Sequence, residues 1–142
     1  MRRIAIPLFC ALLGGCAASP AEMQRIAESE ARQDQRLAEA LEGYEVSGRP
    51  VNCVQQTTLR GNRSFGNTIL YEVGGGGTLY RNDTQPGCRI RQDDILVTRS
   101  PIGNFCSGDI ITTIDRTSRF TTGSCAFGDF IPYRRVRDRD GS

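Results

Sequence analysis

The hydrophobic and polar positions of the chain change pattern twice. Residues 4–13 form one apolar run, and residues 21–42 are rich in Ala, Glu, Gln and Arg, with apolar residues only at intervals. From Pro50 onward, short runs of β-branched and aromatic residues are separated by Gly, Asn and Asp. These patterns predict an export signal, a helix and a small β domain, in that order.

The helix has a clear predicted start and end. Ser19 can cap its first turn, Pro20 suits the first helical position, and Glu22 can complete a capping box. Gly43 supplies a stop signal at the other end. A helix of about 23 residues spans about 35 Å.

The apolar residues of this helix do not form a continuous seam. A polar stretch separates Met23 and Ile26 from Leu37 and Leu41, so a stable coiled coil is not expected. Two hypotheses remain for the helix. It is a solvated spacer, or it docks on a partner through the end that carries Leu37, Leu41 and Tyr44.

The β domain contains six segments with the composition of short strands. The clearest is NTILYEV at residues 67–73, which the four glycines that follow join to TLYRN at 78–82, as in a β-hairpin. These glycines are not a phosphate-binding loop, because neither a GK[ST] ending nor a helical pattern follows them. The other predicted strands are at residues 51–54, 94–99, 109–115 and 127–133. About six short strands predict a mostly β fold, a small antiparallel barrel or sandwich, preceded by one N-terminal helix.

The N-terminal apolar run follows Arg2 and Arg3 and is too short to span a bilayer. It ends in LGGC at residues 13–16, which resembles the lipobox of bacterial lipoproteins, where a signal peptidase cuts before a lipid-modified cysteine. The resemblance implies that Cys16 becomes the mature N-terminus and carries a diacylglycerol thioether, with two or three acyl chains such as palmitate. More than one chain is needed for stable anchoring. The alternative is an ordinary secreted protein cut after Ala18.

The residue after the cysteine bears on location. In lipoproteins an aspartate there often marks retention in the inner membrane, so Ala17 favours the periplasmic face of the outer membrane. The predicted organisation is a lipoprotein signal peptide, a lipidated cysteine with a helical stalk, a disulfide-stapled β domain, and a disordered tail with a single valine as its apolar content. These segments cover residues 1–15, 16–48, 49–133 and 134–142, respectively.

Charge is divided unevenly between the stalk and the β domain. Every basic residue of the chain is Arg, and Lys, His and Trp do not occur. Residues 17–48 hold three Arg and seven acidic residues, a net charge of −4, whereas residues 49–142 hold thirteen Arg and nine acidic residues, a net charge of +4. This asymmetry indicates different surroundings for the two segments.

Four cysteines lie in the β domain: Cys53, Cys88, Cys106 and Cys125. An even number in an exported chain predicts two disulfides, which supplement the small core of such a domain. A metal site is not expected, because the cysteines form no close pairs and the chain has no histidine. Three pairings are open. We favour Cys88–Cys106, which would tie the loops on either side of one predicted strand, and with it Cys53–Cys125.

Several motifs of the β domain together resemble one protein family. RPVNC, TILYEV with its glycine turn, LYRND, FCSGDIITTID and SCAFGDFIPY look like a family of small exported bacterial proteins known as a domain of unknown function. The similarity covers roughly residues 49–133, and the four cysteines occur in the same order. Family members often have Pro-Gly-Leu after the second cysteine, whereas Arg89-Ile90-Arg91 follows it here. The resemblance implies the fold unit and the cysteine framework, and it implies no activity.

The chain lacks the residues of common nucleophilic mechanisms. Without His no Ser-His-Asp or Cys-His pair can form, and without Lys no Schiff base can form. No cofactor is expected. The enzymatic alternative is a carbohydrate-active hydrolase that uses two carboxylates as acid and base. The candidates are Asp93, Asp94, Asp109, Asp115 and Asp129. Their positions favour structural roles in turns and on a solvent-facing strand.

The arginines of the β domain favour a binding role. A planar guanidinium suits phosphates and carboxylates, which the envelope offers in lipopolysaccharide and peptidoglycan. The candidate contacts are Arg60 with Arg63, Arg89 with Arg91, and Arg134 with Arg135 and Arg137. Nucleic acid is not an expected partner of an exported chain with a net charge near zero. The aromatic residues are expected mostly in the core: Tyr71, Tyr80, Phe105, Phe120, Phe127, Phe130 and Tyr133.

These features predict a lipid-anchored envelope protein with a small β binding or accessory module, whose partner is an envelope protein or an envelope glycan or lipid. The alternatives are the hydrolase and a purely structural lipoprotein. An enzyme requires a concave pocket with two of the aspartates about 5 to 10 Å apart. A binding module requires exposed apolar residues beside several arginines.

Overall fold

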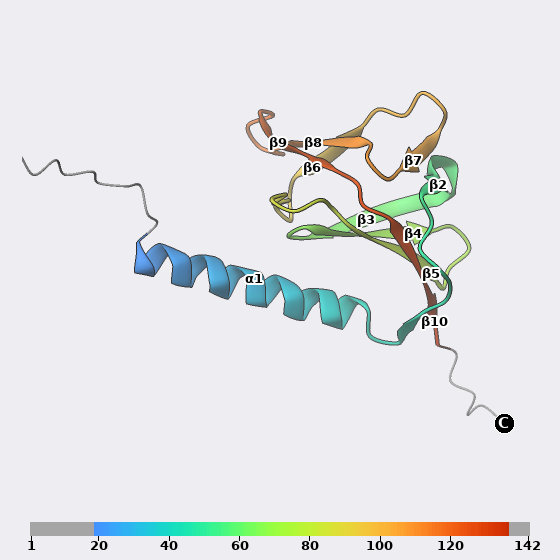
Figure 1. Ribbon diagram of the computed structural model, residues 1–142, viewed down its shortest axis with the longest axis horizontal. Helices are drawn as coiled ribbons and strands as arrows, with labels where there is room; N and C mark the ends of the chain where they lie inside the picture. Colours follow the sequence, from blue (N-terminus) through green and yellow to red (C-terminus); the bar gives the residue numbers. More distant parts are fainter. Residues whose placement is uncertain (1–18, 137–142) are drawn as a thin grey trace, which may run out of the picture.

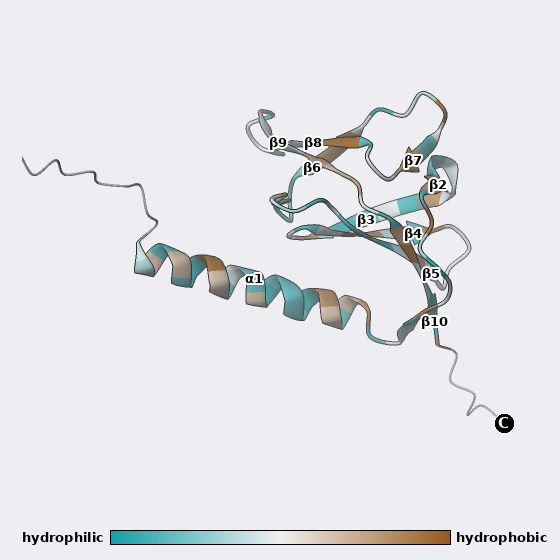
Figure 2. Ribbon diagram, viewed as in Figure 1, coloured by the Kyte–Doolittle hydropathy of each residue, from teal (hydrophilic) through white to brown (hydrophobic). Residues whose placement is uncertain are grey.

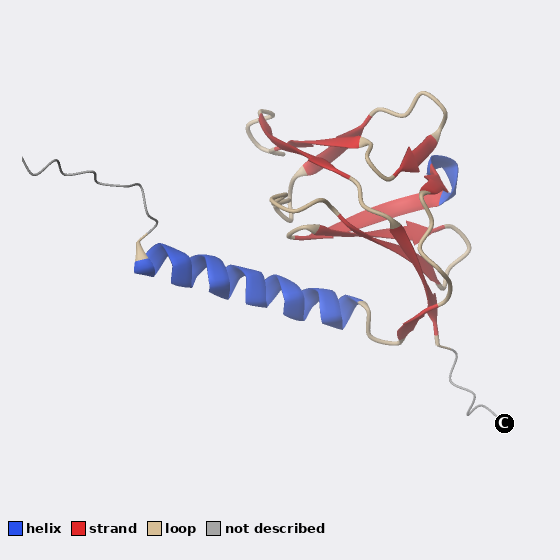
Figure 3. Ribbon diagram, in the orientation of Figure 1, coloured by secondary structure: helices blue, strands red, loops and turns tan. Residues whose placement is uncertain are grey.

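One α-helix, one short 3-10 helix and ten strands form the part of the chain that the structure, a computed structural model, describes, residues 19–136 (Figures 1 and 3). The α-helix is α1, Pro20–Ala40, and the 3-10 helix is η1, Gln56–Thr58. The strands are β1 Tyr44–Val46, β2 Cys53–Gln55, β3 Leu59–Phe65, β4 Thr68–Val73, β5 Thr78–Asp83, β6 Ile95–Thr98, β7 Asn104–Cys106, β8 Ile110–Ile114, β9 Thr121–Ala126 and β10 Phe130–Arg135. The predicted signal peptide, Cys16 and the last six residues of the predicted tail lie outside the described residues.

The cap residue and the first residue predicted for α1 are confirmed, whereas the Glu22 carboxylate makes no return hydrogen bond to complete the capping box within residues 19–136. The Ser19 side chain accepts a hydrogen bond from the Glu22 backbone N–H at 3.2 Å, and Pro20 is the first helical residue. The helix ends at Ala40, and Gly43 has a φ of +75°, a conformation that a residue with a side chain rarely adopts. The chain then turns directly into β1.

The strands form three antiparallel sheets. The largest has the order β1-β10-β5-β4-β3, the smallest pairs β2 with β7, and the third has the order β6-β8-β9. The predicted hairpin is present: β4 pairs with β5, with Tyr71 opposite Tyr80, and residues 74–77 form the turn. The fold is therefore mostly β, as predicted, and these sheets do not close into a barrel within residues 19–136.

The core lies between the five-stranded sheet and the two smaller sheets. Ile69 and Tyr71 of β4 face Ile111 of β8, and the fully buried rings of Phe127 and Phe130 pack between the layers with centroids 5.3 Å apart. Phe105 of β7 stacks on Phe127, and Tyr80 meets Phe130 edge to face. The expectation that aromatic residues lie mostly in the core is confirmed for these rings. It is wrong for Phe120, which is 76% exposed.

The helix covers the opposite face of the five-stranded sheet. Strand alternation places Leu70 and Leu79 on this face, and both are buried. Leu37 is the buried residue of α1, and the helix contacts β3. Figure 1 shows the C-terminal part of α1 beside the domain and its first turns projecting past it.

Polar contacts attach the middle of α1 to the domain. The Glu30 carboxylate pairs with Arg89 at 2.8 Å, and Arg36 donates a hydrogen bond to the side-chain oxygen of Gln92. The end of the helix that carries Leu37 therefore docks on this chain's own sheet rather than being free for a partner. The description as a solvated spacer holds only for the first turns, where Met23 is exposed.

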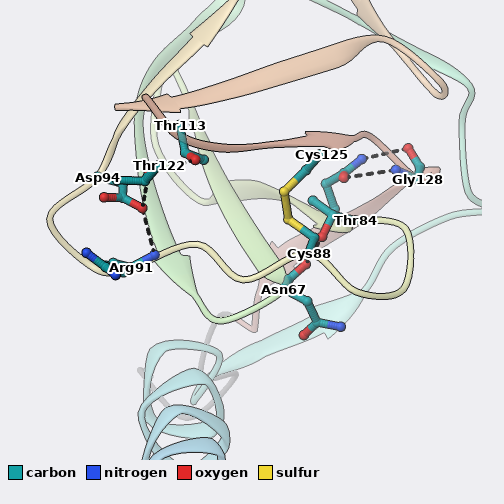
Figure 4. Close-up of a disulfide and its surroundings, with 10 residues drawn as sticks. Asn67, Thr84, Cys88, Arg91, Asp94, Thr113, Thr122, Cys125 and Gly128 are labelled. Atoms are coloured by element: carbon teal, nitrogen blue, oxygen red, sulfur yellow. Dashed lines mark hydrogen bonds between the residues drawn. A yellow bond between two sulfur atoms is a disulfide. The ribbon is translucent and has the colours of Figure 1, made fainter. Parts of the chain in front are cut away.

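The structure corrects the favoured disulfide pairing. The bonds are Cys53–Cys106 and Cys88–Cys125, whereas Cys88–Cys106 and Cys53–Cys125 had been favoured. Cys53 lies directly opposite Cys106 in the β2–β7 pair, so strand register fixes this partner. Cys125 of β9 meets Cys88 in the segment after β5 (Figure 4), which ties the three-stranded sheet to the five-stranded one.

The strand boundaries also differ from the prediction. Four strands, β1, β3, β7 and β9, were not predicted. The predicted disordered tail begins too early, because Arg134 and Arg135 belong to β10 and pair with Glu45 and Tyr44 of β1. Pairing with a neighbouring strand supplies order that the composition of this segment does not suggest.

Candidate binding surface

Three of the five candidate carboxylates hold turns, a role that the sequence favoured for Asp94 and Asp109. Asp94 accepts hydrogen bonds from the Arg91 backbone N–H at 3.1 Å and from the Thr122 hydroxyl at 3.3 Å (Figure 4). Asp109 accepts a 2.8 Å hydrogen bond from the Cys106 backbone N–H. The other two, Asp93 and Asp129, are exposed.

Asp115 is the most strongly engaged of these carboxylates. It accepts hydrogen bonds from the backbone N–H groups of Thr117 and Ser118 at 3.0 and 2.7 Å and from the Ser118 hydroxyl at 3.0 Å. These bonds, chiefly those from Ser118, hold the pKa of the Asp115 carboxyl below its ordinary value, and the charge of Arg91 adds to the effect. A carboxylate held ionised in this way is poorly suited to act as a general acid.

A groove of about 450 Å³ between α1 and the domain brings Asp93 and Asp94 together. Three arginines line the same groove: Arg36, Arg63 and Arg116. Asp94 is committed to its turn, and Asp93 is the carboxylate of this pair that makes no side-chain hydrogen bond within residues 19–136. The groove therefore combines opposite charges. It does not hold two carboxylates in different environments, which one would need to act as the acid and the other as the base.

The six arginines proposed as anion or partner contacts do not gather in one patch. Arg63 pairs with Glu72 at 3.5 Å, and Arg89 is the partner of Glu30 described above. The Arg135 guanidinium lies over the Tyr44 ring, 5.2 Å from its centroid, and donates to the Tyr44 hydroxyl at 3.2 Å. Within residues 19–136 the other three make no ion pair, and they lie on separate segments. They are Arg60 on β3, Arg91 in the loop before β6, and Arg134 on β10.

The outer face of the β6-β8-β9 sheet carries apolar side chains of β6 and β8, of which Val97 and Ile110 are left exposed by the rest of residues 19–136. The residues of β8 that point inward, Ile111 and Thr113, are buried, so alternation places Ile110, Thr112 and Ile114 on the outer face. Ile110 is 58% exposed. The neighbouring β6 adds Ile95 opposite Ile114 and Val97 opposite Thr112. Figure 2 shows the hydrophobic colour along β8, and in Figure 1 the sheet lies on the far side of the domain from α1.

Exposed arginines lie near both ends of this face, although one of them, Arg116, also lines the groove beside α1. Arg99 follows β6 directly, and continuation of the strand register places it beside Ile110. At the other end, Arg116 and Arg119 lie in the turn that joins β8 to β9, next to the exposed Phe120. We call the side chains of Ile95, Val97, Ile110, Thr112 and Ile114, together with Arg99, the open face.

The apolar positions of β6 and β8 are a sequence signal for the open face. A strand with one solvated face alternates apolar and polar residues, but β8 reads Ile-Ile-Thr-Thr-Ile and β6 reads Ile-Leu-Val-Thr. Apolar residues at successive positions of a strand are normally buried on both of its faces. Here the core buries the inner face of β6 and β8, and Val97 and Ile110 on the outer face remain exposed. Such an excess marks either a buried strand or a docking surface.

Other kinds of site receive no support from the described residues. Among residues 19–136 no three His, Cys, Asp or Glu side chains converge as metal ligands do. No helix in this part of the chain has the length and apolar character needed to cross a bilayer.

No family model, no curated protein and no solved structure matches this chain. The resemblance of residues 49–133 to a family of small exported bacterial proteins therefore stays a prediction. Of that resemblance, the structure supports the two-disulfide β unit.

Proposed function

We propose that this protein is a lipid-anchored component of the bacterial cell envelope, whose β domain is a binding or accessory module on the periplasmic face of the outer membrane. The lipobox-like LGGC at residues 13–16 supports the anchor, and two disulfides suit an oxidising compartment. The open face is the observation that carries the binding role, because it combines exposed apolar residues with an arginine at one end.

The partner that fits the open face is a protein segment with an apolar centre and an acidic end. Val97 and Ile110 are exposed and Ile95 and Ile114 are half-buried, and together they offer apolar surface that water solvates poorly. Arg99 at one end attracts a carboxylate and steers its approach. Charge complementarity of this kind favours one orientation of a partner on the face.

The hydrolase alternative has weaker support. Asp94, Asp109 and Asp115 accept hydrogen bonds from nearby backbone N–H groups, and the groove that contains Asp93 also contains three arginines. A purely structural lipoprotein would have no reason to expose an apolar sheet face. We therefore place binding ahead of both alternatives, with no cofactor.

Metabolic labelling with palmitate tests the anchor. We expect the wild-type protein to incorporate label and to fractionate with membranes, and the Cys16→Ser variant to lose the label and be released by osmotic shock. Cys10→Ser is the matched control, because this cysteine lies within the signal peptide that is removed. Equal labelling of the wild type and the Cys16→Ser variant would contradict the anchor.

Photocrosslinking in cells tests the open face. A photoreactive residue in place of Val97 should yield one discrete adduct, and the same residue in place of Val46, an exposed valine of β1, should not. Adding Arg99→Glu should strongly reduce the adduct without unfolding the domain, because this side chain is exposed. An adduct that is undiminished by this charge reversal, or that forms equally from position 46, would overturn this assignment.

A further inference from the structure

The turn between β8 and β9, residues 115–120, presents its side chains on a fixed backbone. Asp115 donates its backbone N–H to the Phe120 carbonyl at 2.9 Å, and Arg119 donates its own to the Asp115 carbonyl at 2.9 Å. Between these two residues, the backbone N–H groups of Thr117 and Ser118 donate hydrogen bonds to the Asp115 carboxylate. The turn is therefore ordered before it meets any ligand, which reduces the entropic cost of binding.

Three side chains of this turn face the solvent and combine apolar surface with positive charge. Phe120 is 76% exposed, and Arg116 and Arg119 are both exposed. Asp115 is the one acidic residue of the segment, so residues 115–120 carry a net charge of +1, and the charge of Arg91 acts on the same site. An exposed aromatic ring with two arginines in the same turn is suited to the boundary between lipid headgroups and acyl chains.

The turn and the start of α1 lie at the same end of the molecule (Figure 1). One groove is lined both by Ser29 and Glu30 of the helix and by Thr122 of β9, so the helix crosses this end of the domain near its middle. Only three residues separate Cys16 from Pro20, and an extended chain covers at most about 3.5 Å per residue. A lipid on Cys16 would therefore hold this end of the protein close to the membrane.

We propose that the β8–β9 turn is a second membrane contact: Phe120 enters the headgroup region of an anionic phospholipid surface, and Arg116 and Arg119 bind its phosphates. This inference rests on the proposed lipid anchor, since one ring and two arginines give a weak contact unless a tether raises the local concentration. The charge of α1 favours the same orientation. Residues 20–40 hold five acidic residues and three Arg, a net charge of −2, so the anionic surface repels the helix and attracts the turn.

Contact through the turn would set the orientation of the whole domain. The open face adjoins the turn, because Ile114 directly precedes the turn and pairs with Ile95. With the turn on the membrane, the open face stands beside the bilayer and is presented to a membrane-associated partner. A free tether alone would leave the domain to rotate.

The absence of Trp from the chain gives a direct optical test. In the Phe120→Trp variant, the single Trp reports on the surroundings of the turn. The control is the Ile102→Trp variant, whose Trp lies in the loop between β6 and β7 at a position that is similarly exposed, 71% for Ile102. Both lipidated proteins are reconstituted into phosphatidylglycerol vesicles that contain brominated acyl chains. We expect a blue shift and strong quenching for Phe120→Trp and neither for Ile102→Trp.

A second set of measurements tests whether the membrane contact depends on charge. Quenching of the Phe120→Trp variant should fall in phosphatidylcholine vesicles and in high salt, because screening weakens contacts between exposed charges. Adding Arg116→Gln or Arg119→Gln should weaken vesicle binding by about fivefold each, the equivalent of about 1 kcal/mol per arginine near an anionic surface. The unlipidated Cys16→Ser form of the Phe120→Trp variant is titrated with the same vesicles to measure the contact without its anchor.

The outcomes separate this inference from the anchor. Mass spectrometry of the same sample shows whether Cys16 carries lipid. If it does and the Phe120→Trp variant is quenched no more than the Ile102→Trp variant, the membrane contact is wrong and the anchor stands. If Cys16 is unmodified and the Cys16→Ser form is still quenched by phosphatidylglycerol, the anchor is wrong and the contact stands. If brominated lipid does not quench the Trp in the turn and the turn crosslinks to a protein in cells, the membrane contact is also wrong.

Discussion

The two larger sheets of this domain differ in how they are covered. The β1-β10-β5-β4-β3 sheet has the core on one face and α1 on the other, and Leu70 and Leu79 on its outer face are buried. The β6-β8-β9 sheet has the core on one face only, and Ile110 on its outer face is 58% exposed. The described part of the chain has one α-helix, and this helix covers the five-stranded sheet and leaves the open face uncovered. The apolar surface left over is therefore where a partner is expected.

The largest expected effect concerns the link between the two sheets. Replacing Cys88 and Cys125 with Ala should lower the free energy of unfolding by about 4 kcal/mol, since the bond closes a loop of 37 residues. Replacing Cys53 and Cys106, which close 53 residues, should cost about as much.

The two double variants should differ in where protection is lost, because only Cys88–Cys125 ties β9 to the larger sheet. Native-state hydrogen exchange should show β8 and β9 losing protection before β4 and β5 in the Cys88→Ala/Cys125→Ala variant. Uniform loss of protection across both sheets would show that they are not separate units.

A matched pair of aliphatic truncations measures the difference in cover directly. Leu70→Ala should cost about 3 kcal/mol, because the side chain is fully buried beneath the helix face. Ile110→Ala should cost less than about 1 kcal/mol, because most of this side chain already faces water. Urea unfolding provides both values, and equal costs would mean that the open face is covered in solution.

The contribution of α1 to this cover is tested by Leu37→Ala. We expect a loss of about 2 kcal/mol, since Leu37 is the buried residue of the helix, and faster exchange of the α1 amides. Met23→Ala on the exposed first turns should stay within about 0.5 kcal/mol of the wild type. Equal effects of the two changes would show that the helix does not dock.

The smallest expected effect is a pH dependence of the β8–β9 turn. Since the pKa of Asp115 in the folded protein lies below its ordinary value, the carboxylate stabilises the turn at pH above that value. This contribution is lost as the pH falls through the folded pKa. The amide resonances of Thr117 and Ser118 should move with this titration, and in the Asp115→Asn variant the movement should disappear.

Local signals in the sequence were sufficient for part of the fold. Ser19, Pro20 and Gly43 define the helix because capping depends on adjacent residues. The β4–β5 hairpin follows from alternation around a glycine turn. By contrast, β3 reads LRGNRSF and β9 reads TTGSCA, and neither has strand composition; each is a strand because of pairing with a stronger neighbour, β4 or β8.

The disulfides and the surface depended on longer-range structure. Cys53 meets Cys106 because β2 pairs with β7, and β7 was not predicted, so the pairing could not be derived. The arginines proposed from local clustering, such as Arg63 and Arg89, are paired with Glu72 and Glu30. Arg99 and the arginines of the turn can be recognised as candidate contacts only from the pairing of β6 with β8. This pairing is what brings exposed apolar residues beside them.

Carbene footprinting tests the central claim most directly. The label is applied to the protein in native membranes and to the purified Cys16→Ser form, and the modification of each exposed apolar side chain is compared. We predict protection in membranes of Val97, Ile110 and Phe120, and unchanged labelling of Val46 and Ile102. Equal labelling of Val97, Ile110 and Phe120 in the two samples would contradict the assignment of this face and its turn as the contact surface.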